Sequence, residues 1–421
     1  MASQATGTAR PQDREPSLPN QQARTLAAVS LAHWVSHVHI LTLPPLFIVL
    51  KAELNASYFE LGLAVTIFGA ISGLTQAPMG FVVDQYGAKR VLLGGLCLGG
   101  LSFISLGFYQ SYTSLLICAA LAGLANCVYH PANYAILSAT IDERRMGRAF
   151  SVHTCAGMLG GAMAPAMGLG IALNAGVGWA LVALGAAGPL AAVIILLLDV
   201  PDTLGAANHG RSKPGGEHDS PIRILSPEIL ALTLFFVLLS LSNGGITNFG
   251  IAALQTGYGV SLEAASAALT LYLSAVACGV LAGGVLADKT RRHGLIAAAC
   301  FVANAMIFGW ISIANPGAAA LLLALATAGL LSGLIAPSRD MMVRKAAPPG
   351  AAGRVFGVVS TGFNIGSIVG PMIFGIILDQ NAPRWLFGFT AIFMLLTVLV
   401  ATWSENRPVR RPINGGIRRG D

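Results

Sequence analysis

The amino-acid sequence predicts an all-α membrane protein in which twelve transmembrane helices form two pseudo-symmetric six-helix bundles. Three observations support this fold class. Of the 421 residues, 55% are hydrophobic and 10% are charged, whereas soluble domains carry roughly 25% charged residues. The apolar residues gather in twelve runs, and the pattern of one half of the chain recurs in the other half. Too few charges remain to cover a surface that faces water, so we expect the protein to lie in a lipid bilayer.

Each apolar run is long enough for a membrane-spanning helix, which needs about 20 mostly apolar residues. The expected helices lie near residues 25–50, 57–83, 90–109, 112–139, 147–174, 177–198, 227–252, 262–287, 294–313, 317–341, 353–380 and 383–403. The six cysteines all fall inside these runs and show no metal-ligand spacing, so we expect small buried thiols.

The segments between and around the runs divide the chain. Residues 199–226 are rich in Pro, Gly and mixed charge without apolar periodicity, which is typical of a flexible linker. The first 24 residues are polar and lack the apolar run of a secretory signal, so we expect a disordered tail. The predicted organisation is a tail (1–24), a first six-helix bundle (25–198), a cytoplasmic linker (199–226), a second six-helix bundle (227–403) and a basic tail (404–421).

An internal repeat relates the two bundles. Residues 336–377 fall without a gap on the stretch 129–171, at an offset of 206 positions that places Pro131 on Pro337 and Pro165 on Pro371. A repeat of about half the chain indicates two copies of one structural unit. We therefore expect two like bundles in parallel repeat, which is a layout of rocker-switch transporters.

The positions of the basic residues predict the orientation. If both termini lie on one side of the membrane, all 25 Lys and Arg residues lie there except Lys51 and Arg384, which lie opposite, and Arg339, which lies within the tenth helix or at its end. Cytoplasmic loops carry an excess of Lys and Arg. We therefore expect both termini in the cytoplasm and the protein in the inner (plasma) membrane. The same clustering accounts for the net charge of +7 without nucleic acid as a partner.

A charged motif follows the second expected helix and reads Gly80-Phe-Val-Val-Asp84-Gln-Tyr-Gly87-Ala-Lys89-Arg90; a weaker copy after the eighth helix contains Asp288. With this motif, the repeat and the linker, the chain resembles the major facilitator superfamily of transporters over nearly its whole length. The resemblance implies that Asp84 faces the start of the eleventh helix near Arg354, and that Asp288 faces the start of the fifth helix near Arg148. The expected gating residues are Gly80, Asp84, Gly87, Lys89, Arg90, Arg148, Asp288 and Arg354.

These acids have a physical reason to act as a gate. A carboxylate near a helix N-terminus gains roughly 0.3–1 kcal/mol when exposed, and more when partly buried. A contact between the halves that exists only while the cytoplasmic side is closed would stabilise one of two states. The alternative is that these residues are simple helix-end charges.

The fifth expected helix is rich in small residues around Gly157, Gly160 and Pro165, and the eleventh carries the similar segment Gly362 to Pro371. Small residues let helix backbones approach closely, and a proline kinks a helix, so we expect kinks at Pro165 and Pro371. The pattern resembles the fifth-helix motif of drug exporters, with Ala164 in place of the expected Gly. Because both halves carry the pattern, we interpret it first as packing at the interface between the halves.

Polar side chains at membrane depth are costly and usually face a cavity. The resemblance implies that helices 1, 4, 7 and 10 line the central path. The expected substrate-binding residues are His33, His37, Asn126, His130, Asn133, Asn243, Thr247, Asn248, Tyr272, Arg339 and Asn364. Among them, His33, His37 and His130 are candidates for proton coupling, because no carboxylate is expected at mid-membrane depth and histidine has a pKa near 6.5. The alternative is that the histidines are hydrogen-bonded packing residues.

Arg339 breaks the symmetry of the repeat, because it aligns with Asn133. It could pair with Asp340 or another acid. If instead it faces the cavity, a fixed positive charge would favour an anionic substrate.

The details of the resemblance separate the possible functions. Ala119 stands where drug-proton antiporters often carry an Arg, whereas segments 33–37, 129–133 and 336–340 resemble the branch of fosmidomycin resistance proteins and small organic-acid permeases. We expect a proton-coupled carrier of a small organic anion that works as a monomer. The alternatives are an exporter of a drug or toxic compound, and a transport-dead sensor or assembly factor. The sequence shows no phosphate-binding loop, metal spacing or nucleophile motif, so we expect neither an enzyme nor a cofactor nor a metal.

Overall fold

The computed structural model describes residues 19–202, 226–290, 292–347 and 352–405, and this part of the chain is helical without a strand. Its helices up to residue 202 are α1 (Pro19–Ile40), η1 (Pro44–Leu46), α2 (Phe47–Leu54), α3 (Tyr58–Tyr86), α4 (Ala88–Phe108), α5 (Tyr112–Thr140), α6 (Glu143–Ala175) and α7 (Val177–Leu197). Those after the linker are α9 (Pro227–Tyr258), α10 (Leu262–Lys289), α11 (His293–Ile313), α12 (Ala318–Ala346), α13 (Ala352–Asp379) and α14 (Arg384–Glu405).

Twelve spans of this part of the chain are long and apolar enough to cross a membrane, which confirms the predicted fold class. The first span differs most from its prediction. It begins at Pro19, within the segment predicted as a polar tail, and it is interrupted after Ile40. Pro44 and Pro45 lack the N–H groups that a continuous helix would need there, so the chain passes through the short helix η1. Most of the predicted tails and linker lie outside the described residues.

The remaining helix ends follow local sequence signals. Ser57, Ser111, Ser226 and Ser261 each accept a hydrogen bond from a backbone N–H in the first turn of α3, α5, α9 and α10. Ser57 and Glu60 form a full capping box. Gly87 joins α3 to α4 with a backbone φ of 91°, a conformation that residues other than glycine rarely adopt.

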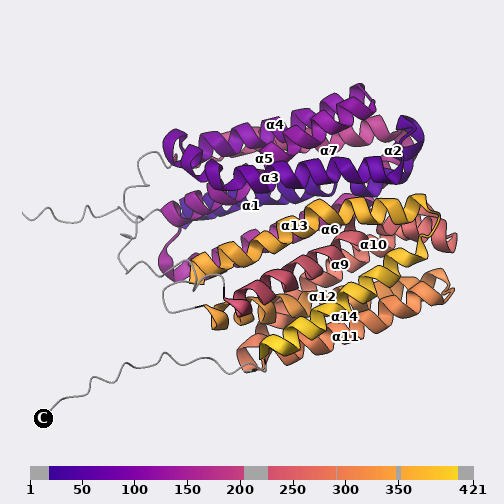
Figure 1. Ribbon diagram of the computed structural model, residues 1–421. Coiled ribbons are helices and arrows are strands. Elements are labelled where there is room, and N and C mark those ends of the chain that lie inside the picture. The colour runs from indigo at the N-terminus through magenta and orange to yellow at the C-terminus, as the bar shows by residue number, and fades with distance from the viewer. Residues whose placement is uncertain (1–18, 203–225, 291, 348–351, 406–421) are drawn as a thin grey trace, which may run out of the picture.

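The helices pack as two halves, α1–α7 and α9–α14 (Figure 1). The halves contact each other through α3 on α13, α6 on α10, and η1 on α9. We call the end of the bundle where α1 begins and α14 finishes the near end, and the opposite end the far end.

The two halves are joined most tightly toward the far end. Leu61 and Thr66, near the start of α3, are buried, and the Thr66 hydroxyl donates to the Ile368 carbonyl of α13 at 2.7 Å. Phe47 and Phe249 bring rings from opposite halves to a centroid separation of 5.2 Å. The close contacts of α3 with α13 run from Tyr58 with Asp379, at the start of α3, to Gly73 with Asn364, near its middle. The described contacts therefore close the far end more than the near end.

The glycine-rich faces of α6 and α13 pack against helices of their own half, whereas the prediction placed them against the opposite half. Gly160 of α6 packs against the Trp34 carbonyl of α1, and Gly366 of α13 packs against Ser240 of α9. A Cβ at either glycine would overlap its neighbour. These glycines therefore pack helices within each half, and not between the halves as predicted, because α6 and α13 meet the opposite half with another face. Both helices continue through Pro165 and Pro371.

Candidate functional site

The structure gathers four histidines in the first half. His33 and His37 lie one turn apart on α1, and the His33 ring meets the rings of His37, His130 of α5 and His153 of α6. The ring centroid of His33 lies 4.7 Å from that of His37, 5.5 Å from that of His130 and 4.0 Å from that of His153, on which it stacks. We call these four residues the histidine cluster. It unites all three histidines predicted for proton coupling and adds His153, which sequence reasoning did not place among the site residues.

Gly157 makes room for this cluster. It lies one turn after His153 on α6, and a Cβ at Gly157 would stand 2.7 Å from the His33 ring and 2.9 Å from the His37 ring. Such distances are far inside van der Waals contact. The small residue therefore lets α6 approach α1 closely enough for the rings to meet.

The protonation pattern of His33 follows from its hydrogen bond. Its Nδ1 lies 2.8 Å from the His153 backbone carbonyl, which can only accept, so Nδ1 carries the hydrogen. In the neutral ring, Nε2 is then the basic atom. This Nε2 is buried and has no hydrogen-bond partner within the described residues. The cluster therefore holds a buried ring nitrogen whose lone pair has no hydrogen-bond partner among the described residues.

The cluster has an exposed side. His130 is exposed, and Tyr134, one turn further along α5, is 44% exposed. The Tyr134 ring lies 5.8 Å from that of His130 and 6.0 Å from that of His153. His33 and His153 are 5% and 0% exposed. The four rings thus run from an accessible surface into the packed interior.

Two other predicted residues of the first half, Asn126 and Asn133, lie on the same helix as His130. Asn126 donates to the Ser72 hydroxyl of α3 at 2.8 Å and is half-buried. Asn133 is completely buried.

In the second half, the predicted polar residues form a separate network. The hydroxyl of Tyr272, which is 1% exposed, lies 3.4 Å from the Asn243 side-chain oxygen and 3.5 Å from Ser332. Ser332 also accepts from Asn304 at 3.0 Å. Sequence reasoning did not select Ser332 or Asn304, because neither stands out from a polar packing residue. Thr247 bonds its own helix at Asn243, Asn248 is half-buried on the same helix, and Asn364 is exposed on α13.

Arg339 adopts the paired arrangement. Its Nε and Nη2 lie 2.9 and 2.8 Å from one Asp340 carboxylate oxygen. The guanidinium also lies over the rings of Phe236 and Phe363, at 5.1 and 5.2 Å from their centroids. Two aromatic faces and a carboxylate therefore already accommodate its charge.

The predicted gating residues lie at the near end. Asp84, Arg148 and Asp288 are exposed, as is Arg90, whose Nε lies 3.3 Å from Asp202. The predicted partner Arg354 has a side chain outside the described residues, so the contact between Asp84 and the start of α13 stays a prediction. Gly80 and Lys89 are half-buried and Gly87 is buried.

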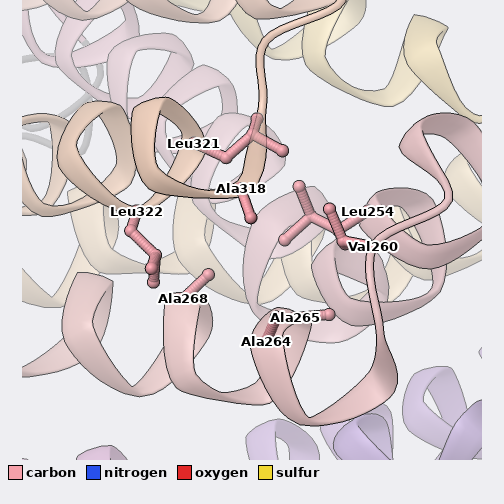
Figure 2. Close-up of a pocket in the computed structure, with 8 residues that line it drawn as sticks. All are labelled: Leu254, Val260, Ala264, Ala265, Ala268, Ala318, Leu321 and Leu322. Atoms are coloured by element: carbon pink, nitrogen blue, oxygen red, sulfur yellow. The ribbon is translucent and has the colours of Figure 1, made fainter.

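Two hollows of the described structure lie away from these residues. Figure 2 shows an apolar pocket between α9, α10 and α12, lined by Leu254, Ala265 and Leu321 among others. Its volume of about 10 Å³ would barely hold one water molecule. A wider hollow of about 310 Å³ lies between α4 and α5. Neither is lined by a predicted site residue, and no group of three or more His, Cys, Asp or Glu in the described ranges is arranged to hold a metal ion.

Comparison with known proteins bears on the family and the fold. A family model described as Major Facilitator Superfamily matches residues 29–317 and 230–419. The fosmidomycin resistance protein of Escherichia coli (strain K12) is 23% identical over 397 residues, covering 91% of this chain and 93% of its own length. The 3-(3-hydroxy-phenyl)propionate transporter of the same strain is 25% identical over 362 residues, covering 80% and 84%.

Solved structures share the fold. A bacterial homolog to the human lysosomal transporter Spinster, in an inward-facing and unoccupied conformation, superposes with a TM-score of 0.69 at 16% identity, covering 92% of this chain and 96% of its own. A mutant form of the nucleoside transporter NupG superposes with a TM-score of 0.73 at 14% identity, covering 91% and 99%.

Proposed function

The chain belongs to the major facilitator superfamily, and from this premise we propose that it is a secondary active transporter that carries a small organic anion together with protons. The two halves would rock about the central helices, so that the substrate site opens to one side of the membrane at a time. The near end, which carries most of the Lys and Arg residues in the described part of the chain, would face the cytoplasm across the inner membrane.

The histidine cluster is the observation that carries this proposal. Histidine titrates near neutral pH, and the cluster combines the exposed His130 with the buried Nε2 of His33. Rings about 4–5.5 Å apart repel one another when more than one is charged. The cluster would therefore hold at most one proton at a time, and it would alternate between a neutral and a singly charged state.

A proton on the cluster would also supply the charge that an anion needs. Arg339 is a weaker candidate for this role, because Asp340 and two phenylalanine rings already surround its guanidinium. An anion beside His130 and Tyr134 would meet an imidazolium and a phenolic hydroxyl, both of which can donate hydrogen bonds to a carboxylate. The similarity to a transporter of an aromatic carboxylic acid supports this substrate class.

The test is transport in liposomes that contain the purified protein. Uptake of radiolabelled aromatic and aliphatic carboxylates, driven by an imposed pH gradient, is expected for the unaltered chain. His33→Gln should remove the response to the gradient. His39→Gln is the matched control, because His39 lies on the same helix, is also buried, and bonds the Leu184 carbonyl away from the cluster. Gradient-driven uptake that survives in His33→Gln would contradict the proton-coupling role.

Export of a drug or toxic compound is the second candidate. The similarity to a fosmidomycin resistance protein over 91% of the chain favours it. Deletion and overexpression of the protein in cells exposed to a broad compound panel tests this function. Export predicts a lower tolerance on deletion and a higher tolerance on overexpression for at least one compound class; an unchanged profile would count against it.

A further inference from the structure

The last residue of α13 bonds the first turn of α3 across the boundary between the halves. The two carboxylate oxygens of Asp379 accept from the backbone N–H groups of Tyr58 at 2.9 Å and of Phe59 at 2.8 Å. Lys51, in the last turn of α2, places its Nζ 3.7 Å from the same carboxylate. One acid of the second half is thus held by three groups of the first half.

The electrostatics of a helix terminus favour this arrangement. The first N–H groups of a helix have no partner within the helix and carry a partial positive charge. In α3, the Ser57 hydroxyl accepts from the N–H of Glu60, while Asp379 takes those of Tyr58 and Phe59. The first turn is therefore capped partly by its own half and partly by the opposite half. Hydrogen bonds to an ionised carboxylate are stronger than those between neutral groups.

Close backbone packing brings the carboxylate within reach. A Cβ on Gly375, one turn before Asp379, would lie 2.7 Å from the Tyr58 carbonyl. Lys51 also stands over the Tyr58 ring, with its Nζ 4.7 Å from the centroid. The Asp379 side chain is only 24% exposed, so the contact is partly shielded from water.

We propose that Asp379, Lys51 and the first turn of α3 form a latch that stabilises the conformation closed at the far end. Because its members belong to different halves, separation of the far ends must break the Asp379 contacts. A group that interacts with one state only shifts the equilibrium toward that state. The inference rests on the proposed rocking motion, but it needs neither the substrate nor the proton coupling of the proposed function.

Only one of the two repeat-related contacts between the halves carries the latch. The repeat places Leu173 of α6 at the position of Asp379, so the related contact of α6 with α10 lacks the acid. At the far-end start of α10, Glu263 is exposed. Glu263 therefore offers a matched control: it is a carboxylate at the same end, in the first turn of a helix, without the bridging geometry of Asp379.

The experiment measures the separation of the far ends by pulsed electron resonance between spin labels. The labels replace Tyr109 of the first half and Ile313 of the second, which are 75% and 84% exposed, in a full chain whose six cysteines are replaced. Asp379→Asn should raise the ratio of far-open to far-closed molecules by roughly tenfold, as expected for the loss of charge from two hydrogen bonds and an ion pair. Lys51→Gln should raise it by less, and Glu263→Gln should leave it unchanged.

An unchanged distance distribution in folded Asp379→Asn would overturn the latch. If that variant does not fold, Lys51→Gln decides: a rise in the far-open ratio supports the latch, and no rise overturns it. A second label pair at the near end, replacing the exposed Ser138 and Arg344, separates this question from the rocking motion. If the near-end labels show two distances, the halves rock; a far-end distribution that does not change in Asp379→Asn would then overturn the latch alone. If both label pairs show a single distance in every variant, the rocking motion and the latch are both overturned.

Discussion

At the scale of single residues, Gly157 is the position on which the histidine cluster depends most directly. A methyl group at this position would stand 2.7 Å from the His33 ring, so either the ring or α6 must move. We expect Gly157→Ala to lower pH-gradient-driven uptake by about tenfold, because near-ångström displacements in a site cost this order of rate or more. Uptake by the reconstituted variant checks this expectation.

Gly170→Ala is the control for that substitution. Gly170 lies on the same helix, and a Cβ there would meet nothing within 4 Å. The two variants make the same change in helix propensity, so only the contact with the histidines differs between them. Equal uptake by both variants would show that the cluster tolerates displacement, and would contradict the dependence on Gly157.

The sequence predicts part of this cluster, for an identifiable reason. His33 and His37 are four residues apart, a spacing that places two side chains on one helix face. His153 faces them because of the way in which α6 packs on α1. Helical periodicity does not predict this packing, because α6 is apolar on most of its sides. The sequence likewise did not show which way the Arg339 side chain faces, so its pairing with Asp340 was one of two open alternatives.

At the scale of helices, Arg384 joins three helix ends of the second half. Its guanidinium donates to the Gly257 carbonyl at 3.1 Å, to the Ala314 carbonyl at 3.4 Å and to the Asn315 side chain at 2.9 Å. We expect Arg384→Gln to destabilise the fold by about 2 kcal/mol, the range for hydrogen bonds to a charged group. Thermal unfolding in detergent should show a lower Tm.

The matched control for Arg384 is Arg344→Gln, since Arg344 is exposed in the last turn of α12. It should leave Tm nearly unchanged, as most surface substitutions do. If the two variants unfold at the same temperature, the hydrogen bonds of Arg384 do not hold these helix ends together.

The helices themselves were largely predictable, because hydropathy and length decide whether a segment can span a bilayer. The first helix was the exception. Its apolar run continues through Pro44 and Pro45, so hydropathy alone extends the span to residue 50, whereas the missing N–H groups end α1 at Ile40.

At the scale of the whole molecule, the two halves must move relative to each other for transport. Gly69 of α3 and Ser367 of α13 face each other across the boundary, with a Cβ on Gly69 3.4 Å from the Ser367 hydroxyl. Cysteines at both positions come close to the spacing of a disulfide. We expect the oxidised double variant to lose uptake almost completely and to regain it after reduction.

Each single cysteine variant serves as its control and should transport in both redox conditions. Full uptake by a double variant whose disulfide is demonstrated by mass spectrometry would mean that α3 and α13 need not separate. Such a result would contradict the rocking motion itself.

The repeat predicted the two halves, but not how they meet. Both conformations of a two-state transporter bury the same apolar runs in the same membrane. The hydropathy pattern therefore does not distinguish one conformation from the other. The closed far end depends on particular contacts such as Tyr58 with Asp379, residues more than 300 positions apart that no local pattern connects.

The aromatic contact at the far end has a consequence for temperature. The rings of Phe47 and Tyr58 from the first half meet Phe249 of the second half, and all three side chains are nearly buried. Opening of the far end would hydrate part of this apolar surface, which raises the heat capacity. The enthalpy of opening would then grow on warming, so a van't Hoff plot of the equilibrium should curve, and the closed conformation should have a temperature of greatest stability.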